Sequence, residues 1–170
     1  MAIDTTKGIA GLKGALRYVR AYRDQVFVVK LGGEVLSEPD ILDSVTGQLA
    51  LLSSLSIRLV VVHGGGPQAT ALSRRLGVEP RMVAGRRVTD DGALDVAKMV
   101  YAGQINVDLL AALRDHRVQA VGLSGVDAEL ITAHRRPPVS VVDDSGATVR
   151  VDYGHVGDID RVDPRILVTL

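Results

Sequence analysis

Two apolar runs that end in glycines constrain the fold of this chain more than any other feature. Residues 26–29 lead into Lys30, Leu31, Gly32 and Gly33, and residues 59–62 lead into His63, Gly64, Gly65 and Gly66. Because neither run alternates with polar residues, each predicts a parallel strand that is buried on both faces. Ligands of open parallel sheets bind at the carboxyl ends of the strands, where glycine lets the backbone approach closely. The two junctions therefore predict an α/β fold with an anion-binding edge.

The rest of the chain predicts helices between such strands and a β-rich end. Helical spacing of apolar residues predicts helices over 37–54, 67–76 and 89–115, the last with a break near Gly103. We expect Ser37 to cap the first of these helices and residues 89–91 to cap the third. A mostly apolar run at 118–123, interrupted by Gln119, predicts a third buried parallel strand.

The chain after residue 123 has a different pattern. We expect a solvated loop at residues 135–138, followed by a β-hairpin whose strands are 139–142 and 148–151 and whose turn is 143–146. A further strand is expected at 155–162, and a last helix is expected to start at 163–164. The whole order of elements predicts a three-layer αβα sandwich with a mainly parallel central sheet and a β-hairpin appendage. Residues 25–170 form this domain, and residues 1–24 are expected to be a tail and a helix that docks another copy of the chain.

Composition excludes several classes of function. The chain has 170 residues, enough for about one domain, with 20 Lys and Arg against 20 Asp and Glu. A net charge of zero argues against generic binding to nucleic acid or to an anionic membrane. The absence of cysteine excludes disulfides and thiolate chemistry and fits a cytoplasmic protein. The four histidines lack the spacing of metal ligands, so we expect no structural metal.

The candidate site residues follow from the glycine junctions. Lys30 can place a movable positive charge on a phosphoryl group, and Gly32, Gly33 and Gly64–Gly66 can offer backbone N–H groups to it. Either junction alone is equally typical of an ordinary tight turn, and neither is a P-loop or a dinucleotide-binding fingerprint. Arg87 can bind a carboxylate with both arms of its guanidinium group, but its spacing alone favours a surface pair with an aspartate of the following helix.

Other polar residues give weaker signals. His63 is expected to orient the glycine run by hydrogen bonding, and Asn106 has the spacing of an exposed helical residue. The serine at 124 is not a nucleophile elbow, because a glycine follows it directly. Nothing in the sequence positions Asp127 and Glu129 as an acid and base pair.

Taken together, five segments resemble the acetylglutamate kinases, which belong to the amino acid kinase family. They are FVVKLGG at 27–33, VVVHGGGPQ at 60–68, GRRVTD at 85–90, AGQIN at 102–106 and AVGLSG at 120–125. The resemblance implies ATP-dependent phosphorylation, with Mg²⁺, of the side-chain carboxylate of N-acetyl-L-glutamate in arginine biosynthesis. It also implies a homo-oligomer, a dimer or hexamer, and arginine as a possible inhibitor.

The same resemblance implies a role for each candidate residue. Lys30 would stabilise the phosphoryl group in transfer, and Gly32 and Gly33 would border the ATP phosphates. Gly64, Gly65 and Gly66 would hold the substrate near its reacting carboxylate. Arg87 would bind the α-carboxylate of the substrate, which reverses the preference drawn from spacing.

Departures from the family leave two alternatives open. Members of the family are longer, and their second half carries the nucleotide lobe, so we expect this chain to be the substrate lobe and inactive alone. Val126, Ala128 and Glu129 stand where many kinases have a lysine and glycines. The segment VDYGH at 151–155 is similar to the arginine-sensing, kinase-like domain of acetylglutamate synthases, whereas Lys30 and the intact glycine run favour a kinase. A bifunctional synthase and kinase would fit both patterns, and a domain used only for assembly is a further possibility.

Overall fold

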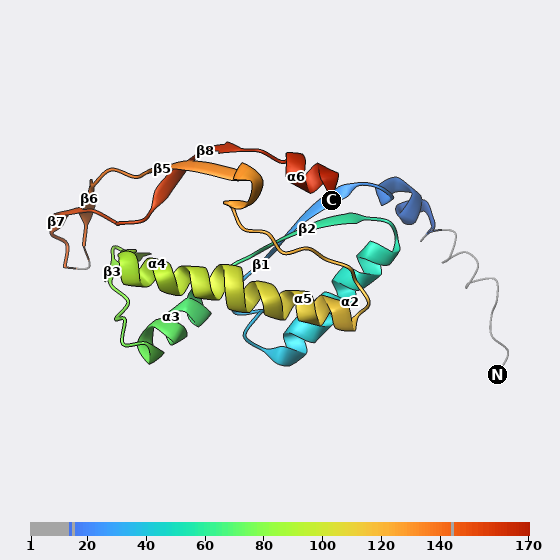
Figure 1. The fold of residues 1–170 in the computed structure, drawn as a ribbon, viewed down its shortest axis with the longest axis horizontal. Coiled ribbons are helices and arrows are strands. Elements are labelled where there is room, and N and C mark those ends of the chain that lie inside the picture. Colours follow the sequence, from blue (N-terminus) through green and yellow to red (C-terminus); the bar gives the residue numbers. More distant parts are fainter. Residues whose placement is uncertain (1–13, 15, 144) are drawn as a thin grey trace.

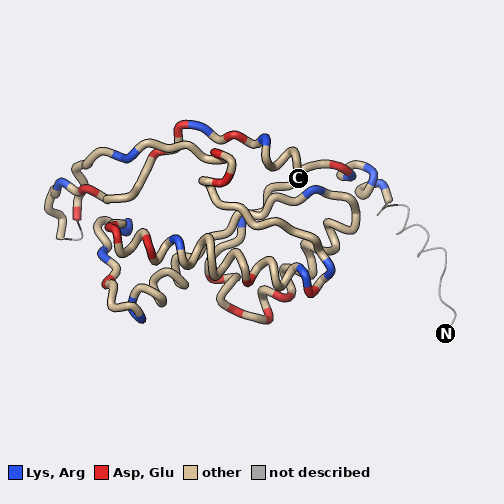
Figure 2. Tube along the Cα trace, in the orientation of Figure 1, with Lys and Arg blue, Asp and Glu red and all other residues tan. Residues whose placement is uncertain are grey.

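The computed structural model describes residues 14, 16–143 and 145–170. Residues 1–13 and 15, which include the expected tail and the start of the expected docking helix, lie outside the described residues. Residues 16–22 of that helix are helical. Docking by this helix stays a prediction. None of the described helices is both long and apolar enough to cross a membrane. Figure 2 shows basic and acidic residues interspersed along the trace.

The two predicted glycine-terminated strands form a parallel pair. Strand β1 (Val26–Leu31) and strand β2 (Arg58–His63) align in register, with Lys30 opposite Val62 and Leu31 opposite His63. Helix α2 (Pro39–Ser54) connects them, as the helical spacing predicts. The expected cap was wrong: the N-cap position of α2 is Glu38, and the Ser37 hydroxyl donates instead to the Gly33 carbonyl oxygen at 3.1 Å.

A long helical rod crosses the molecule in Figure 1. It consists of α4 (Asp91–Ala97), a π-helix η1 (Lys98–Ile105) and α5 (Asn106–Asp115), and it follows helix α3 (Gly66–Arg75). The Asp90 side chain accepts a hydrogen bond from the Ala93 N–H at 2.8 Å, which confirms the predicted cap. The expected break near Gly103 is a change to π-helical winding within a continuous helix.

The core lies on one face of the β1–β2 pair. Leu31, Leu49, Leu109 and Leu113 form a buried cluster against which Val29 and Val61 pack, so α2 and α5 cover that face. A second cluster joins α3 to the rod through Ala69, Val96, Val100 and Ile105.

The opposite face of the sheet is open. Val26 and Val28 are 57% and 70% exposed, so the expectation that β1 is buried on both faces was wrong for the described chain. An unbroken apolar run makes a strand suitable for a position between two covering layers. Whether both of its faces are buried depends on other segments of the protein, which must supply those layers. The described residues supply a helical layer on one face only.

The predicted third parallel strand is also absent from the described chain. Residues 118–123 lack strand structure, and Val121 is 65% exposed. The main sheet therefore consists of β1 and β2 alone in this part of the protein. A central strand is stabilised by ladder partners and by covering layers on both faces. These residues have no ladder partner in the described chain, and only part of the segment packs on the core, through Val118.

The β-rich end forms an arm in Figure 1. Strands β6 (Val139–Val142) and β7 (Thr148–Val151) are the predicted hairpin with the predicted bounds. Strand β5 (Ile131–Arg135) was not predicted; it pairs antiparallel with β8 (Gly157–Val162). A short turn η2 (Asp127–Glu129) precedes it, and the last predicted helix is α6 (Arg165–Thr169).

The expectation of a solvated loop at 135–138 was partly wrong. Arg135 is the last residue of β5. Arg136 forms an ion pair with Asp158 of β8, in which both Nε and Nη2 of the guanidinium group donate to the carboxylate. This pair raises the pKa of Arg136 and lowers that of Asp158. Strands β3 (Met82–Val83) and β4 (Arg86–Arg87) form one more short hairpin, beside the start of the rod.

Candidate anion-binding site

The two glycine junctions lie in backbone contact. The Gly64 N–H donates to the Leu31 carbonyl oxygen at 2.8 Å, which extends the β1–β2 pairing into the junctions. A Cβ atom added to Gly33 would lie 3.1 Å from the Gly65 Cα, and one added to Gly64 would lie 3.4 Å from the Gly33 nitrogen. Since a side chain at Gly33 would displace the other junction, glycine is required there for this close approach.

Gln68 joins the junctions from α3. Its Nε2 donates to the Gly33 carbonyl oxygen at 2.7 Å and to the Ser37 hydroxyl at 2.9 Å. The carbonyl of the buried Gly33 therefore accepts hydrogen bonds from the Gln68 and Ser37 side chains and from the Leu36 N–H, which fix the orientation of the following peptide group. Sequence reasoning missed this role, although Gln68 directly follows the glycine run and Pro67.

The π-helix supports the second junction from inside the protein. A Cβ atom on Gly65 would overlap the Ile105 Cδ1 and would lie 2.7 Å from the Tyr101 ring. Ile105 is 4% exposed and belongs to the core cluster, so η1 packs directly against the glycine backbone. π-Helical turns occur frequently at functional sites. Apart from the expected break near Gly103, no sequence pattern predicted this contact.

Lys30 lies beside the junctions on the open face of the sheet. It is exposed and stands one residue before the end of β1, opposite Val62. Because side chains alternate along a strand, Lys30 shares its face with Val26 and Val28. The Lys30 side chain is therefore exposed near the carboxyl end of β1, next to the first glycine junction.

Arg87 is linked to the glycine run through Thr70. Its Nη2 donates to the Thr70 hydroxyl at 2.5 Å, and that hydroxyl donates to the Gly66 carbonyl oxygen at 2.9 Å. The surface pair that spacing favoured was wrong: Asp90 caps α4, and Asp91 pairs with His155 at 2.6 Å. Half-buried beside α3, Arg87 holds a guanidinium group close to the first turn of that helix.

The weaker candidates have structural partners. His63 Nδ1 lies 3.2 Å from the Gly64 carbonyl oxygen, so the expected hydrogen bond to the glycine run is present. The Asn106 amide donates to the Ala102 carbonyl at 3.4 Å and packs so closely on Gly122 that a Cβ there would overlap it. Asn106 thereby connects α5 to the coil that follows it.

Asp127 organises the turn after that coil. Its Oδ2 accepts from the Ser124 N–H at 2.5 Å and from the Ser124 hydroxyl at 2.8 Å. These two hydrogen bonds lower the pKa of Asp127, because they stabilise the charged carboxylate. Asp127 is therefore a structural acceptor in this turn.

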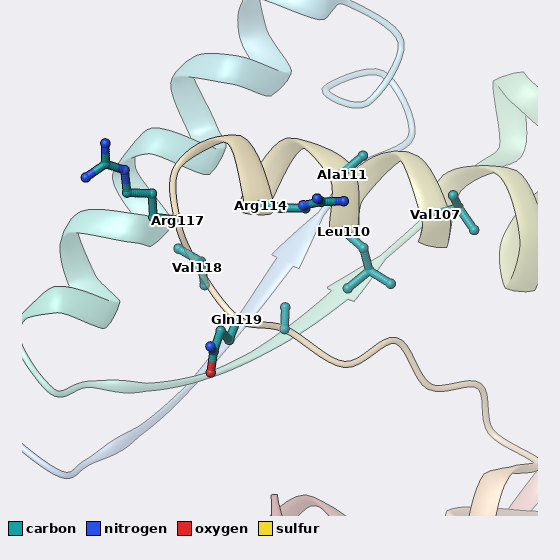
Figure 3. Close-up of a pocket in the computed structure, with 8 residues that line it drawn as sticks. Val107, Leu110, Ala111, Arg114, Arg117, Val118 and Gln119 are labelled. Carbon is teal, nitrogen blue, oxygen red and sulfur yellow. The ribbon is translucent and has the colours of Figure 1, made fainter.

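A shallow groove lies away from these residues. Its volume is about 700 Å³, and it runs along α5 and the coil after it, lined by Val107, Leu110, Ala111, Arg114, Arg117, Val118, Gln119 and Ala120 (Figure 3). None of the candidate residues lines it. In the described part of the chain, no cluster of three or more His, Cys, Asp or Glu has the arrangement of a metal site.

Comparisons with known proteins agree with one another. The sequence profile of the Amino acid kinase family matches residues 25–170. An acetylglutamate kinase of Myxococcus xanthus is 52% identical over 160 residues, which cover 93% of this chain and 52% of that protein. One from Frankia casuarinae is 43% identical, covering 92% of this chain and 41% of that protein. The chain spans about half the length of the curated relatives it matches.

Among solved structures, an N-acetylglutamate synthase of Neisseria gonorrhoeae, crystallised with coenzyme A and L-arginine, superposes with a TM-score of 0.63 and 25% identity. The match covers 95% of this chain and 36% of that chain. A Streptococcus mutans protein superposes with a TM-score of 0.61 at 22% identity, covering 86% of this chain and 54% of that chain, which shows a shared fold.

Proposed function

The chain belongs to the amino acid kinase family, and on that premise we propose that it is the substrate-binding half of an acetylglutamate kinase. The reaction is transfer of a phosphoryl group from ATP to the side-chain carboxylate of N-acetyl-L-glutamate. The observation that carries the proposal is the backbone contact between Gly33 and Gly65, with Arg87 linked to the same glycine run through Thr70.

The site has the chemistry that two anions need. In this proposal, the glycine run Gly64–Gly66 holds the reacting carboxylate at the start of α3, where the helix favours negative charge. The N–H groups of Gly65 and Gly66 bind it, because the Gly64 N–H already donates to the Leu31 carbonyl oxygen. Arg87 binds the α-carboxylate through its other guanidinium donors.

The nucleotide belongs on the side of the first junction. Gly32 and Gly33 border the ATP phosphates, and Lys30 places its ammonium group on the phosphoryl oxygens, whose charge it stabilises in the transition state. Mg²⁺ commonly binds through substrate phosphates and few protein ligands, so its ligands come mainly from ATP. The complete fold is proposed as a three-layer sandwich, in which the face that carries Val26 and Val28 is covered.

Calorimetric titration of N-acetyl-L-glutamate into the 170-residue chain tests the proposal. We expect Arg87→Ala to weaken binding by about tenfold or more, because hydrogen bonds to charged groups contribute about 1.5–3 kcal/mol. Arg86→Ala is the matched control, since this exposed neighbour lies on the same strand and should change binding less than about twofold. Equal losses in the two variants, or no binding by the unmodified chain, would contradict the assignment.

A second candidate function is an arginine-sensing domain. It is supported by the structural similarity to the N-acetylglutamate synthase crystallised with L-arginine. Titration of L-arginine into the same chain separates the two. A chain that binds L-arginine but not N-acetyl-L-glutamate, and that is unaffected by Lys30→Ala, would favour the sensing domain. Binding of N-acetyl-L-glutamate that depends on Arg87 would favour the kinase.

A further inference from the structure

We infer that residues 153–155, far along the chain in the β-rich arm, form a clamp that positions Arg87 for a carboxylate of the substrate. The inference rests on the proposed function for its ligand, while the clamp itself rests on contacts in the structure. Sequence reasoning connected these residues only with the resemblance to synthases. They are positioning residues, since they act through Arg87.

The clamp grips the backbone just after Arg87. The Thr89 N–H donates to the Tyr153 carbonyl oxygen at 2.9 Å, and the His155 N–H donates to the Thr89 carbonyl oxygen at 2.7 Å. Thr89 and Gly154 thus form an isolated parallel bridge. Both backbone polar groups of Thr89, two residues beyond Arg87, are bonded to the clamp.

Two side chains extend the clamp to the turn of the short β3–β4 hairpin and to the start of α4. Tyr153 is 4% exposed, and its hydroxyl donates to the Val83 carbonyl oxygen at 3.2 Å. His155 Nε2 lies 2.6 Å from an Asp91 carboxylate oxygen at the start of α4. The hairpin that carries Arg87 is therefore held beside its turn, at Val83, and beyond its second strand, at Thr89 and Asp91.

The hairpin needs such support because it is small. It consists of two residue pairs, Met82 with Arg87 and Val83 with Arg86, plus one further hydrogen bond from the Val88 N–H to the Arg81 carbonyl. Hairpins of this size are marginal by themselves in water. An arginine that binds a carboxylate with both arms needs a fixed geometry, so an external clamp improves its binding.

Gly154 makes the close approach possible. Its φ angle is +73°, in the left-handed region, and its N–H donates to the Asp152 carboxylate at 2.8 Å. A Cβ atom at this position would overlap the Thr89 carbonyl oxygen. Because that obstacle is backbone, an added methyl group must push Thr89 away and shift the strand that leads back to Arg87.

The test compares two glycines of the arm with the same backbone strain. Gly146 has a φ angle of +84° and open space around it, so Gly146→Ala strains the backbone without touching Thr89. In the ligand-free 170-residue chain, we expect Gly154→Ala to speed amide hydrogen exchange at Thr89 and His155 by about tenfold, and Gly146→Ala to leave it within about twofold. Equal exchange in the two variants would overturn the clamp.

Titration of N-acetyl-L-glutamate then tests the link to Arg87. We expect Gly154→Ala to raise the dissociation constant about three- to tenfold, and Gly146→Ala to change it less than about twofold. In an Arg87→Ala background, Gly154→Ala should have no further effect, since the clamp acts through that arginine. A full additional loss there would overturn the positioning role.

Two further outcomes keep the inference separate from the proposed function. If Gly154→Ala does not fold, Tyr153→Phe, which removes only the hydrogen bond to Val83, should raise the dissociation constant and speed exchange at Val88 to a smaller extent. Unchanged values in Tyr153→Phe would then count against the clamp. If the unmodified chain binds no N-acetyl-L-glutamate, the proposed function and the ligand of the clamp are both wrong, while the exchange result still decides the clamp.

Discussion

Two adjacent glycines in the second junction should respond oppositely to the same substitution. A methyl group on Gly65 would overlap the Ile105 Cδ1, which lies in a core cluster, and would meet the Tyr101 ring at 2.7 Å. Overpacking of this kind costs about 1–3 kcal/mol, and loss of glycine at the N-cap position adds about 0.5–1 kcal/mol. Gly65→Ala should therefore lower the free energy of unfolding by roughly 1.5–4 kcal/mol.

Gly66→Ala is the matched control. Gly66 is the first residue of α3 and has no atom within 4 Å of an added Cβ. Alanine is the better helix former, so this variant should gain up to about 1 kcal/mol. With a slope near 2 kcal/mol per molar urea, the midpoint of unfolding should fall by about 1–2 M for Gly65→Ala and rise slightly for Gly66→Ala.

A second substitution identifies the obstacle. Ile105→Val removes the Cδ1 atom and alone should cost about 0.5–1.5 kcal/mol. In the Gly65→Ala background it should instead restore stability, because it deletes the atom that the new methyl group overlaps. Strictly additive losses in the double variant, or a larger loss in Gly66→Ala, would refute the packing of the π-helix against this glycine.

Two further predictions concern the β-rich end. Hydrogen bonds from the Arg165 side chain and N–H lower the pKa of Asp163 from 3.8 to about 2, so this carboxylate stabilises the fold above pH 4 and loses that effect as the pH falls towards 2. Thermal unfolding should show a steeper decrease over this range for the unmodified chain than for Asp163→Asn, and parallel curves would contradict the assignment. Ala128 has a φ angle of +49°, in the left-handed region that glycine adopts without strain. Ala128→Gly should therefore raise the free energy of unfolding by up to about 1 kcal/mol, seen as a higher urea midpoint. A lower midpoint would contradict the left-handed conformation of this residue.

The pattern of apolar and turn residues was sufficient to predict those strands and hairpins that depend mainly on their own residues. The apolar runs predicted β1 and β2, and the turn residues predicted the hairpin β6–β7 to the residue. Adjacency of the two glycine junctions also followed, because parallel strands that pair in register end at the same edge.

Burial and long-range contacts could not be predicted in this way. The run at 118–123 has the composition of a central strand, yet Val121 is exposed because no described segment covers or pairs with it. The spacing around Arg87 predicted the wrong partner, since its guanidinium group bonds to Thr70 of α3, and residues 153–155 of the arm bond to Thr89, two residues beyond it. Contacts between residues that are distant in the chain depend on the fold, which spacing alone does not contain.

The central claim is that both glycine junctions serve one anion-binding site, and backbone amide NMR tests it most directly. N-acetyl-L-glutamate titrated into the isotopically labelled chain should shift the amide signals of Gly64, Gly65 and Gly66, and ATP should shift those of Gly32 and Gly33. Each set should follow a single saturable curve that Arg87→Ala weakens for the first ligand and Lys30→Ala for the second. Shifts confined to the groove along α5, or glycine signals that do not move with either ligand, would contradict the account.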